Sequence, residues 1–169
     1  YGMEGYLVND IEDNEPGLPV LEKSSYHIVL LAQNDIGRVN LYTLISKSHL
    51  EYFGGPSKGP KRPRIPKSEL LKYREGILIG SACEAGELLR AILRGDSDER
   101  IEQVASFYDY LEIQPIENNH FMLLNDVKYP QIQSEEDLRD LNRRIVSLGE
   151  KLNKPEVATC DTHFLNPED

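Results

Sequence analysis

Two polar side chains near the C-terminus, Asp161 and His163, have the types and the spacing of metal ligands. They follow the short run Glu156-Val-Ala-Thr-Cys160, which is typical of a buried strand that delivers polar groups at its C-terminal end. Residues two apart on an extended backbone point the same way, so this carboxylate and imidazole would lie side by side and suit a divalent metal such as zinc or manganese. A helix cap followed by a surface histidine explains the same residues, so other segments must decide.

A second candidate ligand, Cys83, follows another short apolar run. The run Gly76-Ile-Leu-Ile-Gly80 is predicted to be a buried strand, and the small residues of Ser81-Ala-Cys83-Glu-Ala-Gly form an elbow before a helix. Cys83 therefore sits at the same kind of strand end as Asp161. A lone buried cysteine is also common as a small apolar side chain, and that alternative stays open.

The elements that must position these residues alternate along the chain. Helical periodicity, capping residues and β-branched runs predict five strands separated by helices, with an irregular stretch over 118–133. Such alternation is typical of parallel βα units, and five strands are too few to close an ordinary barrel. The expected strands are 2–9, 26–32, 76–80, 108–114 and 156–160, and the expected helices are 36–49, 68–73, 86–93, 96–107 and 134–152.

Local signals place the ends and inner faces of three of these helices. Asn34-Asp35 could cap helix 36–49, and Ser134-Glu-Glu-Asp137 resembles a capping box at the start of helix 134–152. The apolar face of 36–49 is predicted to hold Val39, Leu41, Leu44 and Ile45, and the inner face of 96–107 is predicted to hold Ile101, Val104 and Ala105.

Composition excludes several classes of protein. A chain of 169 residues with 39% hydrophobic content can bury the core of one domain, and it has no apolar run of the roughly 20 residues that span a bilayer. The net charge of -10 argues against a broad nucleic-acid surface but leaves room for a local one. Two cysteines give no disulfide framework, which suits a cytoplasmic protein. The first residues resemble neither a signal peptide nor a natural start, so we expect a fragment.

One basic segment, 54–67, stands out on this acidic chain. Four prolines and three glycines within 54–66 exclude a helix there. A phosphate backbone or an acidic partner would explain its charges, and a solvated loop explains them as well and is favoured. The charged residues are Lys58, Lys61, Arg62, Arg64 and Lys67.

Several motifs together resemble one family, the PHP (polymerase and histidinol phosphatase) domain of bacterial replicative DNA polymerase III alpha subunits, in particular those of PolC type. Each motif is weak alone, but their order covers nearly the whole chain, so residues 1–169 are interpreted as a single PHP-domain fragment. The motifs are Gly2-Met-Glu4-Gly-Tyr, Tyr26-His27-Ile-Val-Leu-Leu-Ala, Arg64-Ile-Pro, Ser81-Ala-Cys83-Glu-Ala-Gly-Glu87 and Thr159-Cys-Asp161-Thr-His163-Phe-Leu.

The resemblance implies an α/β fold, a partial and distorted βα barrel of TIM-like type with mostly parallel strands. It also implies a divalent metal site whose ligands here are Glu4, His27, Cys83, Asp161 and His163. The family's first two ligand motifs would precede residue 1, so the fragment would hold at most half of the site, and metal could be absent from it. An inserted proofreading exonuclease of the family would fall at residues 10–25.

One ligand conflicts with the predicted elements. If the second strand runs from Tyr26 to Ala32, His27 lies near its start, about 16 Å from its far end. That placement predicts that His27 is separated from Cys83 and Asp161.

The function expected from the resemblance is that of a metal-binding accessory or structural domain of a cytoplasmic replicative polymerase. Its partner would be the rest of the alpha subunit, DNA would be reached through the parent protein, and no catalytic residue is assigned to this piece. A free-standing metal-dependent phosphoesterase and a metal-free interaction module remain as alternatives. Unpaired strand edges also predict that the fragment forms a homodimer.

Overall fold

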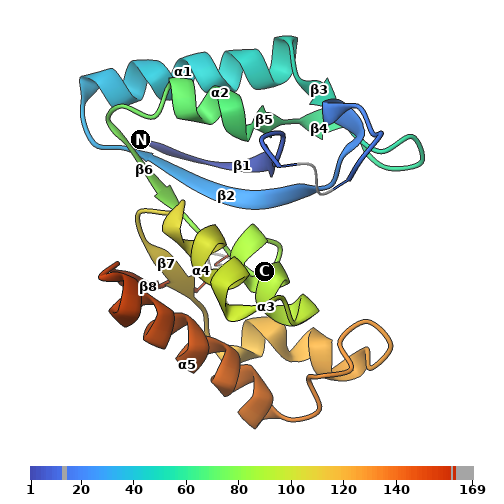
Figure 1. Cartoon of the computed structure of the whole chain (residues 1–169). Helices are drawn as coiled ribbons and strands as arrows, with labels where there is room; N and C mark the ends of the chain where they lie inside the picture. The colour runs from blue at the N-terminus through green and yellow to red at the C-terminus, as the bar shows by residue number, and fades with distance from the viewer. Residues whose placement is uncertain (13–14, 161, 163–169) are drawn as a thin grey trace. The chain divides into compact units, whose positions relative to one another are not determined.

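The computed structural model describes residues 1–12, 15–160 and 162. The chain divides into two compact units, Tyr1–Glu87 and Leu88–Asp169 (Figure 1). The prediction of one domain over 1–169 stays a prediction. No helix among the described residues is both long enough and apolar enough to cross a membrane.

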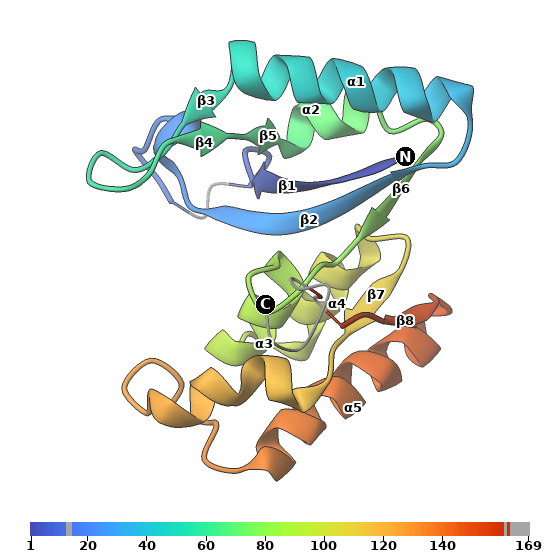
Figure 2. The same cartoon turned by 180° about the vertical axis from the view of Figure 1, so that it is seen from behind.

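The first unit is built on a four-stranded sheet in the order β5-β1-β2-β6. Helices α1 (Asp35–Leu50) and α2 (Lys67–Lys72) cover one face of it (Figure 2). The core holds alternate side chains of the long strands, among them Leu7, Ile28, Leu30 and Ile79, together with Leu41 and Leu44 of α1. The strands are β1 (Gly2–Val8), β2 (Ser25–Ala32), β5 (Ile65–Pro66) and β6 (Ile77–Gly80).

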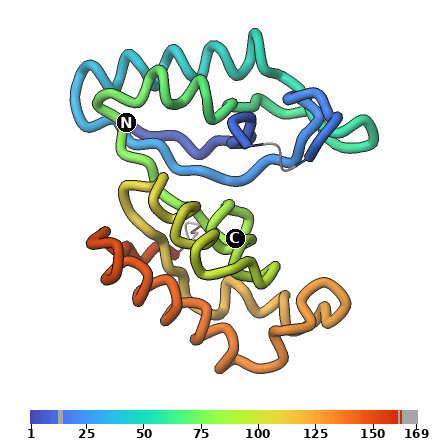
Figure 3. Tube along the Cα trace, in the orientation of Figure 1, coloured from blue at the N-terminus to red at the C-terminus, as the bar shows by residue number. Residues whose placement is uncertain are grey.

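The long strands of this sheet run antiparallel, which corrects the prediction of mostly parallel strands. β1 pairs with β2 from Gly2 opposite Leu31 to Val8 opposite Ser25, and β2 pairs antiparallel with β6; only the short β5 is parallel to β1. The link between β1 and β2 contains no crossover helix among its described residues, only the three-residue 3-10 turn η1 (Val20–Glu22). Between β2 and β6 the chain passes through α1, β5 and α2, and β6 starts beside the end of β2, where Ile77 pairs with Ala32 (Figure 3).

The predicted helix 36–49 is confirmed as α1, with Asn34 as its N-cap. The Asn34 side chain accepts a hydrogen bond from the Gly37 N–H at 2.9 Å. A Cβ on Gly37 would lie 1.7 Å from the Gly76 carbonyl oxygen, so only glycine permits this approach of α1 to the turn before β6. Val39, predicted on the apolar face, is 54% exposed.

Residues 54–66 of the basic segment are non-helical, as predicted, and its last residue, Lys67, begins α2. β3 (Phe53–Gly54) and β4 (Arg62–Pro63) form an antiparallel hairpin. Two of the five basic side chains are buried, however: Arg64 is 3% exposed and Lys67 is 5% exposed. A solvated loop is therefore the wrong description of these two residues, because each has partners that compensate the loss of water.

The second unit carries a parallel pair of strands with one helix between them, as the alternation predicts. β7 (Leu111–Ile113) and β8 (Glu156–Ala158) are parallel, and α5 (Glu135–Leu152) packs against β7. Two shorter helices precede β7, α3 (Glu87–Arg94) and α4 (Asp98–Ser106).

Two predictions for this unit need correction. The stretch 118–133, expected to be irregular, begins within the 3-10 helix η2 (Ile116–Leu124), where Met122 packs with Ile132 and Leu138. β8, expected to be buried, is exposed at Val157 and Ala158. The described strands form three separate sheets and no closed barrel.

Candidate metal centre

Three predicted ligands converge in the first unit: Glu4 of β1, His27 of β2 and Cys83 of the loop after β6. One ligand atom from each lies within 4.8 Å of the other two. The Glu4 Oε1 atom is 3.1 Å from Nδ1 of His27, and the Cys83 Sγ atom is 3.5 Å from the same nitrogen. The structure thus brings together three of the five residues that the sequence singled out.

The strand register places Glu4 beside His27. β1 and β2 pair so that Tyr6 lies opposite His27 and Glu4 opposite Val29. Residues two apart on a strand share a face, so Glu4 is the diagonal neighbour of His27 on the face that α1 and α2 do not cover.

A tight loop after β6 brings Cys83 to the same point. The backbone N–H of His27 donates to the Ala85 carbonyl oxygen at 3.0 Å, and the Gly86 N–H donates to the Cys83 carbonyl oxygen at 2.9 Å. Ala82 has a left-handed backbone with φ of 58°, which is uncommon for a residue with a Cβ. A Cβ on Gly86 would lie 2.2 Å from the Ser81 carbonyl oxygen, so the loop needs glycine there to fold back this closely.

The prediction that His27 is separated from Cys83 is therefore wrong. It assumed parallel strands, in which the start of β2 is far from the end of β6. Because β6 is antiparallel to β2, its end at Gly80 pairs with Val29, two residues from His27. Asp161 and His163 lie outside the described residues, and their part in the site stays a prediction.

The centre is polar and accessible on one side. The side chain of Glu4 is 61% exposed and that of His27 is 29% exposed. Burial, the largest effect, raises the pKa of the Cys83 thiol to about 12, and the nearby Glu84 and Glu4 carboxylates act in the same direction. The thiol is therefore protonated at neutral pH until a cation displaces its proton.

The donor set fits a divalent metal. Nδ1 of His27 faces both a carboxylate and a thiol, and its single hydrogen-bonding position cannot serve the two at once, whereas one cation at that point would bind all three groups. Imidazole and thiolate ligands of a tetrahedral zinc lie about 3.5 Å apart at the usual bond lengths. The observed distance between Sγ and Nδ1 matches that separation.

Comparison with known proteins decides the family. The family model described as "PHP domain" matches residues 1–126, which include Glu4, His27 and Cys83. This chain belongs to the PHP domain family. The mixed α/β character of a PHP domain agrees with the strands and helices seen here, although the described sheets are partial.

The PHP domain is similar to parts of much longer bacterial proteins, each named DNA polymerase III PolC-type. It is 52% identical to that of Clostridium perfringens and 47% identical to that of Bacillus subtilis, in each case over 144 residues that cover 85% of this chain and 9% of the relative. It is 40% identical to that of Thermotoga petrophila over 162 residues, which cover 96% of this chain and 11% of the relative. The chain thus spans about a tenth of the length of the curated relatives it matches.

Two residues beside the centre, Tyr6 and Arg62, were not placed there by the sequence analysis. The Tyr6 and His27 rings meet in a T-shaped arrangement with centroids 5.2 Å apart, and the guanidinium carbon of Arg62 lies over the Tyr6 ring, 4.6 Å from its centroid. Tyr6 was predictable in principle, because it is two residues from Glu4 on one strand and so shares its face. Nothing in the sequence pairs Arg62 with Tyr6, since that contact depends on where the hairpin folds.

Proposed function

We propose that this PHP domain is part of a replicative DNA polymerase III alpha subunit of PolC type, in which it serves as a metal-binding accessory or structural domain. The similarity to the PolC-type relatives, maintained over most of the chain, supports the assignment. The observation that carries the metal-binding role is the convergence of Glu4, His27 and Cys83 from three separate segments.

In this proposal His27 and Cys83 fix the position of a divalent ion, zinc or manganese, and the Glu4 carboxylate contributes negative charge at the exposed side. Asp161 and His163 are the further ligands that we predict. A divalent ion held there supplies Lewis-acid polarisation of a phosphoester oxygen. The mixed sulfur, nitrogen and oxygen donors favour zinc over manganese, since manganese prefers oxygen ligands.

Nucleotide transfer belongs to other parts of the polymerase in this proposal. The partner of the domain is the remainder of the alpha subunit, and DNA is reached through the parent protein. The charge of -10 agrees with this division, because an acidic surface repels the phosphate backbone over most of its area.

A free-standing metal-dependent phosphoesterase is the second candidate function. The 61% exposure of the Glu4 side chain favours it, because a reacting phosphoester needs access to the ion. Hydrolysis of bis(p-nitrophenyl) phosphate by the metal-loaded chain, abolished in His27→Asn, would support this activity. Metal binding without hydrolysis would support the structural role.

The metal-binding role is tested by loading the purified chain with zinc or manganese and measuring metal per chain by elemental analysis. His27→Asn and Cys83→Ser should each lower the affinity at least about tenfold, because each removes a direct ligand. The matched controls are His49→Asn, an exposed histidine on α1, and Cys160→Ser, the other free cysteine. Equal metal content in all five proteins would refute the proposal.

A further inference from the structure

A buried carboxylate, that of Glu87, follows directly after the loop that carries Cys83. Glu87 is 1% exposed, and its side chain has partners from two other segments. The Asn9 Nδ2 atom donates to Glu87 Oε1 at 3.0 Å, and the Lys67 ammonium donates to Glu87 Oε2 at 3.3 Å. A buried ion pair adds little net stability compared with apolar side chains of similar volume, so the geometry that it fixes is its more informative property.

The two partners of Glu87 lie at one end of the sheet. β1 and β5 run parallel and end side by side. Asn9 directly follows β1 and Lys67 directly follows β5, so both lie at the same end. β2 begins at this end, because it is antiparallel to β1, and His27 is near its start. The Glu87 carboxylate is therefore bound at the end of the sheet where His27 lies.

The loop of residues 81–86 is held at both of its ends. At one end β6 pairs with β2, and at the other Gly86 forms a bridge to β2 and Glu87 follows directly. Between these attachments Ala82 has a left-handed backbone, with φ of 58°. A backbone of that kind persists only where the surrounding structure constrains it. Cys83 lies in the middle of the loop, so its position depends on both attachments.

The approach of Cys83 to His27 leaves little room for movement. Sγ and Nδ1 are 3.5 Å apart, which is the separation of two ligands on one zinc ion. Metal ligands must stay within about 0.5 Å of the productive geometry, and hydrogen-bonded neighbours hold them there. A loop released at one end would lose this match.

We propose that Glu87 is a positioning residue for the metal centre, which fixes the loop after β6 so that the Cys83 thiol faces His27. This inference rests on the proposed function, since it concerns the same centre. The carboxylate is a fixed point because Asn9 and Lys67 hold one oxygen each. Glu87 is not itself a ligand in this proposal, because its side chain is 2% exposed and already bound on both oxygens.

The first test measures the zinc affinity of the whole chain, by competition with a chelator, and the absorption of the chain loaded with cobalt(II). Glu87→Gln keeps the shape of the side chain but removes the charge that holds Lys67. It should lower the zinc affinity at least about tenfold, as loss of a group that orients a metal ligand does. It should also weaken the cobalt–thiolate absorption band, which reports sulfur ligation and which a mere loss of stability would not change.

Glu69→Gln is the matched control. Glu69 is also buried, at 7% exposed, and also pairs with lysines, Lys47 and Lys72. It belongs to α2 and is no part of the loop or its attachments. Its substitution should leave the zinc affinity and the cobalt absorption unchanged, and equal effects of Glu69→Gln and Glu87→Gln would overturn the inference.

The double variant Lys67→Met, Glu87→Leu separates positioning from stability. It removes both charges, so no ion is left buried without its counter-charge, and it should fold at least as well as Glu87→Gln. Its zinc affinity should still be at least about tenfold below that of the unsubstituted chain, because no hydrogen bond then fixes the end of the loop. A zinc affinity that returns to normal together with stability would overturn the inference.

The reaction of Cys83 with N-ethylmaleimide tests the loop without any metal. In a Cys160→Ser background Cys83 is the only thiol. Burial raises the pKa of this thiol, so it reacts slowly while the loop is in place. Glu87→Gln should raise the rate about tenfold, because the loop opens more often, and Glu69→Gln should not change it. An unchanged rate in Glu87→Gln would refute this inference alone, whereas an unsubstituted chain that binds no metal would refute the proposed function.

Discussion

Strands β7 and β8 of the second unit run parallel with α5 between them in sequence, whereas β1, β2 and β6 of the first unit run antiparallel. The sequence predicts strands separated by helices in both units, so hydrophobic periodicity does not distinguish them. One helix between two strands returns the chain to the end where the first strand started, which gives a parallel pair. In the first unit β1 and β2 are joined without a crossover helix among the described residues, and the chain passes through α1, β5 and α2 between β2 and β6. The number of helices alone does not fix strand direction, because α1 lies between β2 and β5 and these two strands run antiparallel.

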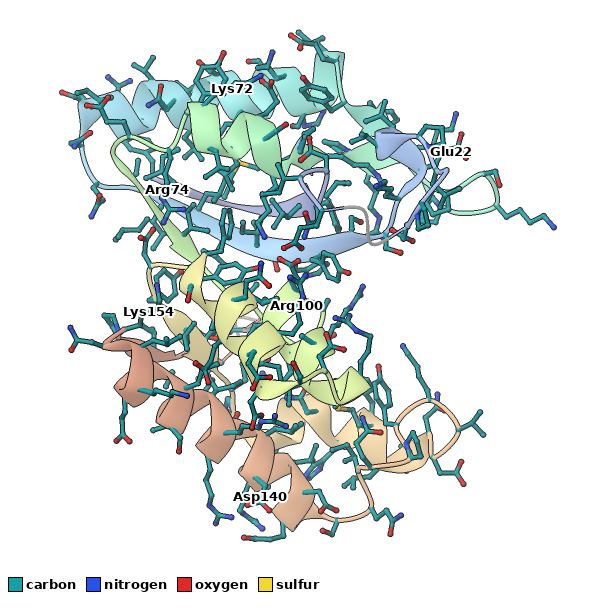
Figure 4. All side chains as sticks on the ribbon, in the orientation of Figure 1. Glu22, Lys72, Arg74, Arg100, Asp140 and Lys154 are labelled. Carbon is teal, nitrogen blue, oxygen red and sulfur yellow. The ribbon has the colours of Figure 1, made fainter. Side chains whose placement is uncertain are left out.

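The two units also differ in how deeply their described ion pairs are buried. In the first unit Lys67 Nζ lies 3.3 Å from Glu87 Oε2 with both side chains almost fully buried, and Asn9 Nδ2 donates to Glu87 Oε1 at 3.0 Å. The described ion pairs of the second unit lie nearer the surface, for example between Arg143 and Asp140, whose side chains are 60% and 64% exposed. Asp140 is labelled in Figure 4.

The largest expected effect comes from breaking the buried pair. Glu87→Gln should destabilise the first unit by about 3–5 kcal/mol, because it leaves the Lys67 ammonium buried without its counter-charge. Asp140→Asn, the matched change in the second unit, should lower the free energy of unfolding by only about 0–1 kcal/mol, because water screens the exposed pair of Asp140 with Arg143. Hydrogen exchange followed by mass spectrometry would assign each loss to β1 and β2 or to α5. Equal costs in the two variants would remove the distinction between buried and surface pairs.

A smaller loss of stability is expected from substituting the helix glycines, and Gly37 of α1 and Gly149 of α5 should respond differently. Gly37→Ala should destabilise the first unit by about 3 kcal/mol, because its Cβ meets the Gly76 backbone, which is held by the sheet. The nearest atoms to a Cβ in Gly149→Ala on α5 all belong to the Glu156 side chain, with Oε1 at 2.1 Å and Cγ at 2.7 Å, and that flexible side chain can move. Alanine has a better helix propensity than glycine, which offsets this close contact. The free energy of unfolding should therefore change by no more than about 1 kcal/mol. Urea titration followed by circular dichroism measures both, and a costly Gly149→Ala would contradict this account.

The smallest effect concerns the capping box of α5 and its dependence on pH. The Gln133 N–H, the Ser134 hydroxyl and the Ser134 N–H hold the pKa of Asp137 below its usual range. The stabilisation is fully present above the unfolded-state pKa of about 3.9 and is lost as pH falls through the lower folded-state pKa.

Asp137→Asn should therefore unfold more easily than the unsubstituted chain at pH 7, with a difference that shrinks below about pH 4. Ser134→Ala, which removes the cap oxygen and one of the three donors to the Asp137 carboxylate, should cost about 1 kcal/mol at pH 7 and less at pH 2, where that carboxylate is protonated. Thermal melts of α5 by circular dichroism would check these results. A difference for Asp137→Asn that persists at pH 2 would show that charge is not its cause.

Local signals predicted much of the secondary structure. Asn34 and Ser134 were correctly placed as helix caps, because a cap depends on residues three positions away. Ile101, Val104 and Ala105 were correctly placed on the inner face of α4. Val39 of α1 was misplaced because its periodicity does not say how wide a stripe of the helix the sheet covers.

The candidate site was predictable as a set of residues but not as an arrangement. Resemblance to the PHP family pointed to Glu4, His27 and Cys83, whereas the place of Tyr6 beside Glu4 followed from the alternation along β1 but was not predicted. The contact of His27 with Cys83 contradicted the parallel topology that the sequence favoured. The division of the basic segment into buried Arg64 and Lys67 and exposed neighbours was equally absent from the sequence.

The sequence by itself determined the family, the caps and the approximate bounds of most elements, because these depend on residue types over short separations. Only the tertiary structure decided that β2 and β6 run antiparallel and that His27, Cys83 and Glu4 therefore meet. It also decided that Arg62 stacks on Tyr6 while Arg64 anchors the hairpin. These outcomes depend on pairings between residues far apart in the chain, which the packing of α1 and α2 on the sheet selects and no local pattern encodes.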